Sequence, residues 1–176
     1  MSPWVILLRG VNVGGAGKLP MAEWRALLAE QGFDRPETFI QSGNAVIGSD
    51  LPREAIAARI GEGIASRFGF RPEVFVRRPE EIEALRADHP FAGDDPARVY
   101  VFLLGGAPDG IDPDRIAALA ARGERWVMSE AAFVLSAPEG MGRSVLAERI
   151  GRILKVPMTA RNLRTLQALA EMASRR

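Results

Sequence analysis

The chain has 176 residues, of which 47% are hydrophobic and 26% charged, and its formal net charge is +1. This composition is typical of a folded protein of one domain or two small ones, and it excludes disordered and collagen-like chains. Because there is no cysteine and His89 is the single histidine, disulfides, thiolate sites and histidine clusters are excluded. We therefore expect no metal and no cofactor. No apolar run reaches the length of a membrane span or a signal-peptide core, which predicts a cytoplasmic protein.

The first predicted element is an apolar strand that runs into a glycine-rich polar loop. Residues 3–8 form a short, partly β-branched run, and four glycines follow within residues 10–17. Glycine lets backbone approach a ligand and adopts positive φ at low cost, so these glycines beside Arg9, Asn12 and Lys18 predict an anion-binding loop. The alternative carries equal weight: a flexible connection that needs glycine for its geometry alone.

The loop matches neither of the common phosphate-binding motifs. When Gly17 and Lys18 are aligned with the Gly-Lys of a P-loop, Asn12 stands at the first glycine and Leu19 at the magnesium-binding Ser/Thr. A dinucleotide fingerprint also fails, because Pro20 stands at the position of its third glycine. Backbone amides remain as the means by which this loop would bind an anion.

The rest of the first half alternates between helical and β patterns. Pro20 opens a helix, and isoleucines spaced four apart from Ile56 onward predict a second one. Two β-rich runs, 38–40 and 45–47, flank a short turn and predict a hairpin, and a last strand covers 73–76. The order of strand, helix, hairpin, helix and strand is that of a split β-α-β, or ferredoxin-like, unit.

The hairpin turn Gln41-Ser42-Gly43-Asn44 is the second segment of interest. Ser, Gly and Asn are what a tight turn demands, and we favour that structural interpretation over a ligand contact. In an antiparallel pair, the loop that leaves the first strand adjoins the turn that enters the third. Loop and turn are therefore predicted to form one polar site.

The second half repeats the same order of elements in a plainer form, without the polar residues of the glycine loop. The expected fold class is α+β, with two tandem ferredoxin-like halves and a C-terminal helix that Thr159 can cap. The expected domains are a first half at 1–77, a linking helix and linker at 78–96, a second half at 97–159, and the C-terminal helix at 160–176.

The charges are unevenly distributed along the chain. From Met141 to the end there are eight basic and two acidic side chains. We interpret this region as solvated helix surfaces, although such asymmetry also occurs in faces that bind phosphate or nucleic acid. The aromatic signatures of RNA-binding sheets are absent, which argues against a nucleic-acid partner. The oligomeric state stays open.

Segments 7–15, 18–21 and 39–46 closely resemble the opening motifs of a bacterial family, domain of unknown function 1697. The resemblance extends to 142–144 and to 159–162, which is similar to a closing Thr-x-Arg-Asn-Trp signature. Here Leu163 replaces the usual Trp, and Ala168 stands where a Lys is common. The resemblance implies two ferredoxin-like halves and no established activity. It marks these candidate ligand-binding residues: Arg9, Asn12, Gly14, Gly15, Lys18, Gln41, Ser42, Gly43, Asn44, Arg161 and Asn162.

Three functions are compatible with these residues. The leading hypothesis is a binding protein for a small anionic or phosphorylated ligand at the loop and turn. The second is an enzyme in which Arg9, Lys18 or Arg161 stabilises negative charge and Ser42 acts as nucleophile. It lacks a convincing base, since His89 precedes a proline in the linker region. The third is an interaction module that docks a partner through its last helix.

Overall fold

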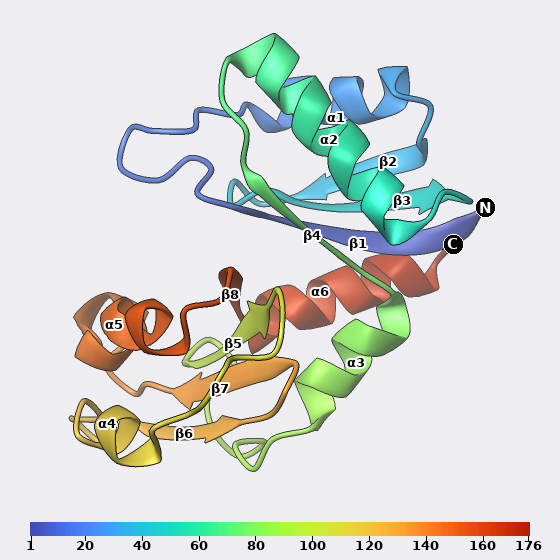
Figure 1. The fold of residues 1–176 in the computed structure, drawn as a ribbon. Coiled ribbons are helices and arrows are strands. Elements are labelled where there is room, and N and C mark those ends of the chain that lie inside the picture. The colour runs from blue at the N-terminus through green and yellow to red at the C-terminus, as the bar shows by residue number, and fades with distance from the viewer. The chain divides into compact units, whose positions relative to one another are not determined.

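The computed structural model describes residues 1–176 and contains six α-helices and two four-stranded antiparallel sheets (Figure 1). The α+β class expected from the sequence is confirmed. The chain divides into two compact units, Met1–Glu83 with Ala168–Arg176, and Ala84–Gln167, each built around one sheet. None of the helices combines the length and the apolar character that crossing a membrane requires.

The first unit contains the sheet β2-β3-β1-β4, with helices α1 and α2 on one of its faces (Figure 1). A core of fully buried apolar side chains, among them Ile6, Trp24 and Ile60, fills the space between helices and sheet. The predicted isoleucine stripe is confirmed as the buried face of α2. The elements are β1 (Ser2–Arg9), α1 (Met21–Glu30), β2 (Asp34–Phe39), β3 (Asn44–Ser49), α2 (Arg53–Phe68) and β4 (Glu73–Arg77).

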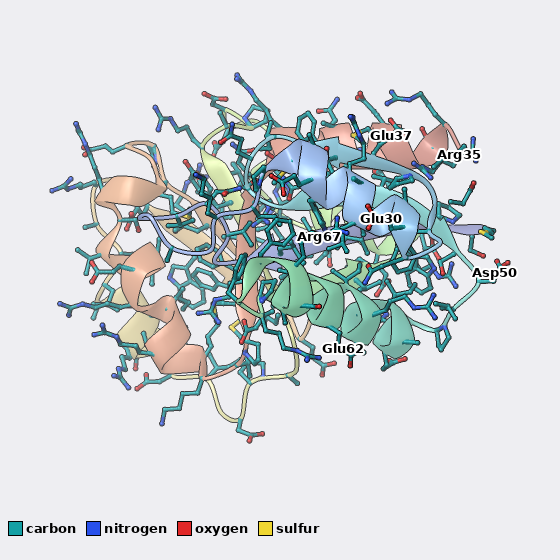
Figure 2. The ribbon with its side chains drawn as sticks, turned by 90° about the horizontal axis from the view of Figure 1, so that it is seen from above. Glu30, Arg35, Glu37, Asp50, Glu62 and Arg67 are labelled. Atoms are coloured by element: carbon teal, nitrogen blue, oxygen red, sulfur yellow. The ribbon has the colours of Figure 1, made fainter.

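Helices α1 and α2 approach each other closely where α2 carries Gly63. A β-carbon at this position would lie 2.2 Å from Nε2 of Gln31, which donates a hydrogen bond to the Arg59 carbonyl at 2.6 Å. Glycine lowers helix stability, but here it leaves room for the contact between the helices. An ion pair between Arg67 and Glu30 joins the same two helices at the surface (Figure 2).

Edge strand β2 differs in detail from the prediction. It begins at Asp34, before the predicted run, and its pairing with β3 shifts register between Asp34 and Glu37, where Arg35 has a φ of 41°. Ile40, predicted to end the strand, lies beyond it with a φ of 46°. Left-handed backbone is rare for a β-branched residue, so no sequence pattern indicates this conformation.

The last residue of the chain holds this irregular edge. The side chain of Arg176 is 4% exposed, and its guanidinium donates to the carbonyls of Asp34, Arg35 and Val46 and to the carboxylate of Glu37. Planar guanidinium groups suit several acceptors at once. Arg176 thereby ties the chain's C-terminus to the β-bulge of β2 and to strand β3.

Arg176→Ala is expected to lower the free energy of unfolding by about 1–2 kcal/mol, because three backbone carbonyls lose their donor. Arg175→Ala is the matched control, since the side chain of Arg175 is exposed and its loss should change stability by less than about 0.5 kcal/mol. Urea unfolding followed by circular dichroism measures both. Equal stability of the two variants would show that the Arg176 contacts contribute nothing.

The second unit contains the sheet β6-β7-β5-β8, and the linking helix α3 (Pro79–Ala87) leads into it. Its helix α5 has Ser144 as the N-cap, whose Oγ accepts a hydrogen bond from the Ala147 amide at 2.9 Å. The C-cap is Lys155, whose backbone is left-handed. The elements are β5 (Val99–Leu104), α4 (Pro113–Ala117), β6 (Arg125–Met128), β7 (Ala132–Ser136), α5 (Val145–Leu154) and β8 (Met158–Asn162). Helix α6 (Leu163–Ser174) follows β8, and its residues from Ala168 onward belong to the first unit.

The two halves are similar element by element. Each has the order β-α-β-β-α-β and the same arrangement of strands in its sheet. The register agrees as well: Leu8 donates to the Gly43 carbonyl at 2.9 Å, and Leu104 donates to the Ala131 carbonyl at 3.0 Å. The duplication read from the sequence is therefore present in the structure.

Strand β8 was not predicted. Thr159 lies inside this strand, and the N-cap of α6 is Asn162, whose Oδ1 accepts from the Thr165 amide at 2.9 Å. The prediction of Thr159 as the cap was thus wrong. Apart from Thr159, this run contains residues such as Ala160 and Asn162 that are depleted in strands, and its pairing with β5 specifies the strand instead.

Candidate functional site

The glycine-rich loop after β1 folds back on itself as a small hairpin. The Asn12 amide donates to the Gly17 carbonyl at 2.9 Å, and the Ala16 amide donates to the Val13 carbonyl at 3.1 Å. Between them, two glycines have φ of 59° and 80°, and positive φ at both central residues is what a type I′ turn requires. Turn geometry therefore accounts for the glycine pair at 14 and 15.

Asn12 joins this loop to the hairpin turn between β2 and β3. Its Nδ2 donates to the carbonyls of Leu19 at 2.9 Å and Gln41 at 2.8 Å, and its Oδ1 accepts from the Leu19 amide at 2.8 Å. Asn12 has a φ of 54°, a conformation that asparagine tolerates better than most residues. The predicted adjacency of loop and turn is confirmed. We call residues 9–19 and 41–44 the loop-and-turn site.

Gly43 has a structural reason to be glycine. Its φ is 78°, and a β-carbon would lie 2.5 Å from Cγ2 of Val11 and 2.8 Å from Cβ of Leu8. Its carbonyl also accepts the Leu8 amide. The turn is therefore packed directly on β1 and on the start of the glycine loop.

The side chain of Asn44 forms hydrogen bonds that stabilise the turn. Asn44 is fully buried, and its Nδ2 donates to Oγ of Ser42 at 2.8 Å and to the Phe39 carbonyl at 3.1 Å. These bonds fix the Ser42 side chain relative to the end of β2. They support the structural interpretation of the turn that the sequence favoured.

The charged groups of the site differ in their surroundings. Arg9 forms an ion pair with Glu73 at 2.8 Å, and both side chains are about half exposed. Glu73 lies directly opposite Arg9 in the β1–β4 ladder, and sequence reasoning missed it. The opposite charges at the ends of two predicted strands were the available signal. Lys18 is exposed and makes no ion pair or hydrogen bond within the chain.

Arg161 and Asn162, the other two candidate residues, belong to β8 in the second unit. The Arg161 guanidinium donates to Oγ1 of Thr159 at 2.9 Å and to the Ala160 carbonyl at 2.8 Å. Burial lowers the pKa of Arg161 to about 10, because the charged form loses hydration. Asn162 is the cap of α6, so strand and helix geometry accounts for this part of the sequence motif.

The second unit also contains a polar cavity of about 310 Å³. The carboxylate of Asp94 accepts hydrogen bonds there from Ser136 and Arg125. The Ser136 hydroxyl in particular lowers the pKa of Asp94. The carboxylate of Asp94 is therefore already hydrogen-bonded to residues of the second unit. Nowhere in the chain do three histidine or acidic side chains gather as ligands of a metal ion would.

Comparison with known proteins places the chain in a family. No curated protein matches it. The solved structure of a conserved bacterial protein from Streptococcus pneumoniae matches with a TM-score of 0.72 over 98% of each chain at 24% identity, a likeness that shows the fold alone. Residues 1–133 match the family described as "Protein of unknown function (DUF1697)", and this match includes the whole loop-and-turn site. The chain accordingly belongs to the DUF1697 family.

Proposed function

We propose that the loop-and-turn site binds a small anionic ligand, a phosphate or phosphorylated compound in particular. The observation that carries this proposal is the triple hydrogen bonding of Asn12, which holds the glycine hairpin against the turn at Gln41. Two segments far apart in the chain thereby present one fixed surface. Binding to such a preformed surface costs little ordering entropy.

The groups available on this surface favour an anion. The amides of Gly14 and Gly15 donate no hydrogen bond within the chain, and Lys18 is an unpaired ammonium on the same hairpin. Backbone N–H groups beside a cation are suitable donors to a phosphate or carboxylate. Arg9 adds a second cation, because its exposed ion pair with Glu73 is worth only about 0.2–1 kcal/mol and can be exchanged for a ligand.

No specific observation favours the enzyme hypothesis to the same degree. Oγ of Ser42 accepts a hydrogen bond from Nδ2 of Asn44, a contact that holds the turn together. A serine nucleophile needs a general base within hydrogen-bond reach.

We also assign each half to the ferredoxin-like type, a proposal that the strand order β2-β3-β1-β4 and its counterpart β6-β7-β5-β8 support.

The proposal is tested by calorimetric titration of the full chain with glycerol 3-phosphate, with glycerol as the uncharged control probe. Glycerol 3-phosphate is expected to bind and glycerol is not. Lys18→Gln should weaken binding about two- to fivefold, because an exposed ion pair contributes at most about 1 kcal/mol. Lys155→Gln, at the chain's other lysine, should leave it unchanged. Absence of binding, or equal losses in both variants, would contradict the proposal.

A further inference from the structure

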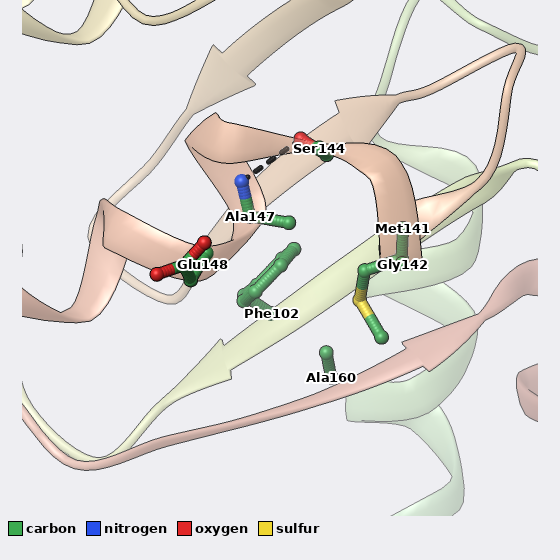
Figure 3. A pocket seen from close by; sticks show the side chains of 7 residues that line it. All are labelled: Phe102, Met141, Gly142, Ser144, Ala147, Glu148 and Ala160. Carbon is green, nitrogen blue, oxygen red and sulfur yellow. Dashed lines mark hydrogen bonds between the residues drawn. The ribbon is translucent and has the colours of Figure 1, made fainter.

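A cavity of about 410 Å³ in the second unit is unrelated to the loop-and-turn site (Figure 3). Its lining is mostly apolar and includes the ring of Phe102, the methyl group of Ala160 and the thioether of Met141. Strands β5 and β8 supply the first two, and the turn before α5 supplies the third. The volume lies within the range of small-molecule sites.

The similarity of the two halves shows which residue of the first half stands at the position of Ala160. Phe102 pairs with Ala160 in the second sheet, and Ile6 pairs with Val76 at the same register in the first. Val76 is 1% exposed and packed in the first core. Alanine at the matching position lacks two methyl groups and leaves the sheet face uncovered beside Phe102.

A second pair of residues also differs in size between the two halves. In the first half, the buried Trp4 ring is covered by the guanidinium of Arg78, 3.6 Å from the ring centroid. At the same register the second half has Tyr100 paired with Asn162, and Asn162 is engaged as the cap of α6. Both residues are smaller than their counterparts Trp4 and Arg78 in the first half.

The one ionisable residue that lines the cavity is Glu148, which lies on the first turn of α5 and is exposed to solvent. Glu148 forms no ion pair, and no lysine or arginine lines the cavity. In Figure 3 the side chain of Phe102 is seen between those of Glu148 and Met141. A carboxylate beside an aromatic face attracts a cation from two directions, by charge and by the ring quadrupole.

The helix N-terminus at this cavity does not reverse that preference. The amide of Ala147, which would otherwise attract an anion, is occupied by Oγ of Ser144 at 2.9 Å (Figure 3). The carboxylate of Glu148 further offsets the positive end of the helix dipole.

We propose that this cavity binds a small organic amine: an apolar body against Phe102 and Ala160, with its ammonium group at Glu148. This site is independent of the anion site in the first unit. Such a site should prefer cationic ligands to anionic ones. Probes of similar size and opposite charge therefore distinguish it from an apolar cavity without charge preference.

The test is a titration of the ¹⁵N-labelled full chain with phenethylamine, 2-phenylethanol and 3-phenylpropanoate, followed by amide shifts. Phenethylamine is expected to bind with a Kd on the order of 1 mM, to shift amides around Met141, Ala147 and Ala160, and to bind more tightly than the alcohol. The carboxylate should bind most weakly. Equal affinities for the three probes, no binding, or shifts confined to other regions would overturn the proposal.

Two variants and one control assign the effect. Glu148→Gln should weaken phenethylamine about two- to fivefold and leave 2-phenylethanol unchanged. Glu130→Gln, which removes an exposed carboxylate at the β6–β7 turn, should change neither. Ala160→Val, which copies the first half, should weaken both probes by filling the cavity. An unchanged preference for the amine in Glu148→Gln would contradict the assignment, and it can be read even if Ala160→Val does not fold.

Discussion

Replacing Gly43 with alanine is expected to lower the free energy of unfolding by about 2–5 kcal/mol, which sums left-handed backbone strain and overpacking. The φ of Gly43 is 78°, and the added methyl would lie 2.5 Å from Val11 and 2.8 Å from Leu8. Both neighbours are buried, so neither can move away without disturbing the core beside β1. Chemical denaturation measures the loss.

Gly15→Ala separates the two causes. Gly15 also has positive φ, at 80°, but nothing lies within 4 Å of an added β-carbon. Its substitution should therefore cost only the backbone term, about 1–2 kcal/mol. If both alanine variants lost the same stability, the packing of Gly43 on Val11 and Leu8 would be ruled out as a determinant.

Asn12→Gly is expected to lower the free energy of unfolding by about 1.5–3 kcal/mol, because three hydrogen bonds to the backbone are lost. Glycine retains the left-handed backbone of this position, so the variant removes the side-chain contacts without adding backbone strain. The same variant should lose measurable binding of glycerol 3-phosphate, since loop and turn are no longer joined.

Gln41→Ala is the matched control for Asn12→Gly. Asn12 contacts the carbonyl of Gln41 and not its side chain, so removal of that side chain should alter stability by less than about 0.5 kcal/mol. A large loss in Gln41→Ala, or no loss in Asn12→Gly, would contradict the role assigned to Asn12. Thermal unfolding of both variants gives the comparison.

Regular patterns in the sequence predicted several elements of the fold correctly. The four-residue spacing from Ile56 to Phe68 predicted α2, and the turn residues at Ser42 to Asn44 predicted the β2–β3 hairpin. The adjacency of loop and turn followed from the antiparallel order of the first and third strands, and Asn12 confirms it. These features depend on local pattern and on strand order, both of which the sequence contains.

Other features depend on tertiary contacts and left no local pattern. Strand β8 is specified by pairing with β5, and the left-handed backbone of Ile40 contradicts its own propensity. The cavity beside Phe102 depends on the pairing of Phe102 with Ala160 across β5 and β8, and an alanine in the sequence gives no sign of it. The contact of Arg176 with Asp34 in β2 joins residues 142 positions apart and has no sequence signal.

The central claim is that the glycine hairpin and the turn form one anion-binding surface. Titrating the ¹⁵N-labelled chain with inorganic phosphate tests it most directly. The amide signals of Gly14, Gly15 and Lys18 are expected to move together with one saturation constant, and the movement should vanish in Asn12→Gly. Phosphate-dependent shifts confined to other parts of the chain, with these three amides unmoved, would contradict the claim.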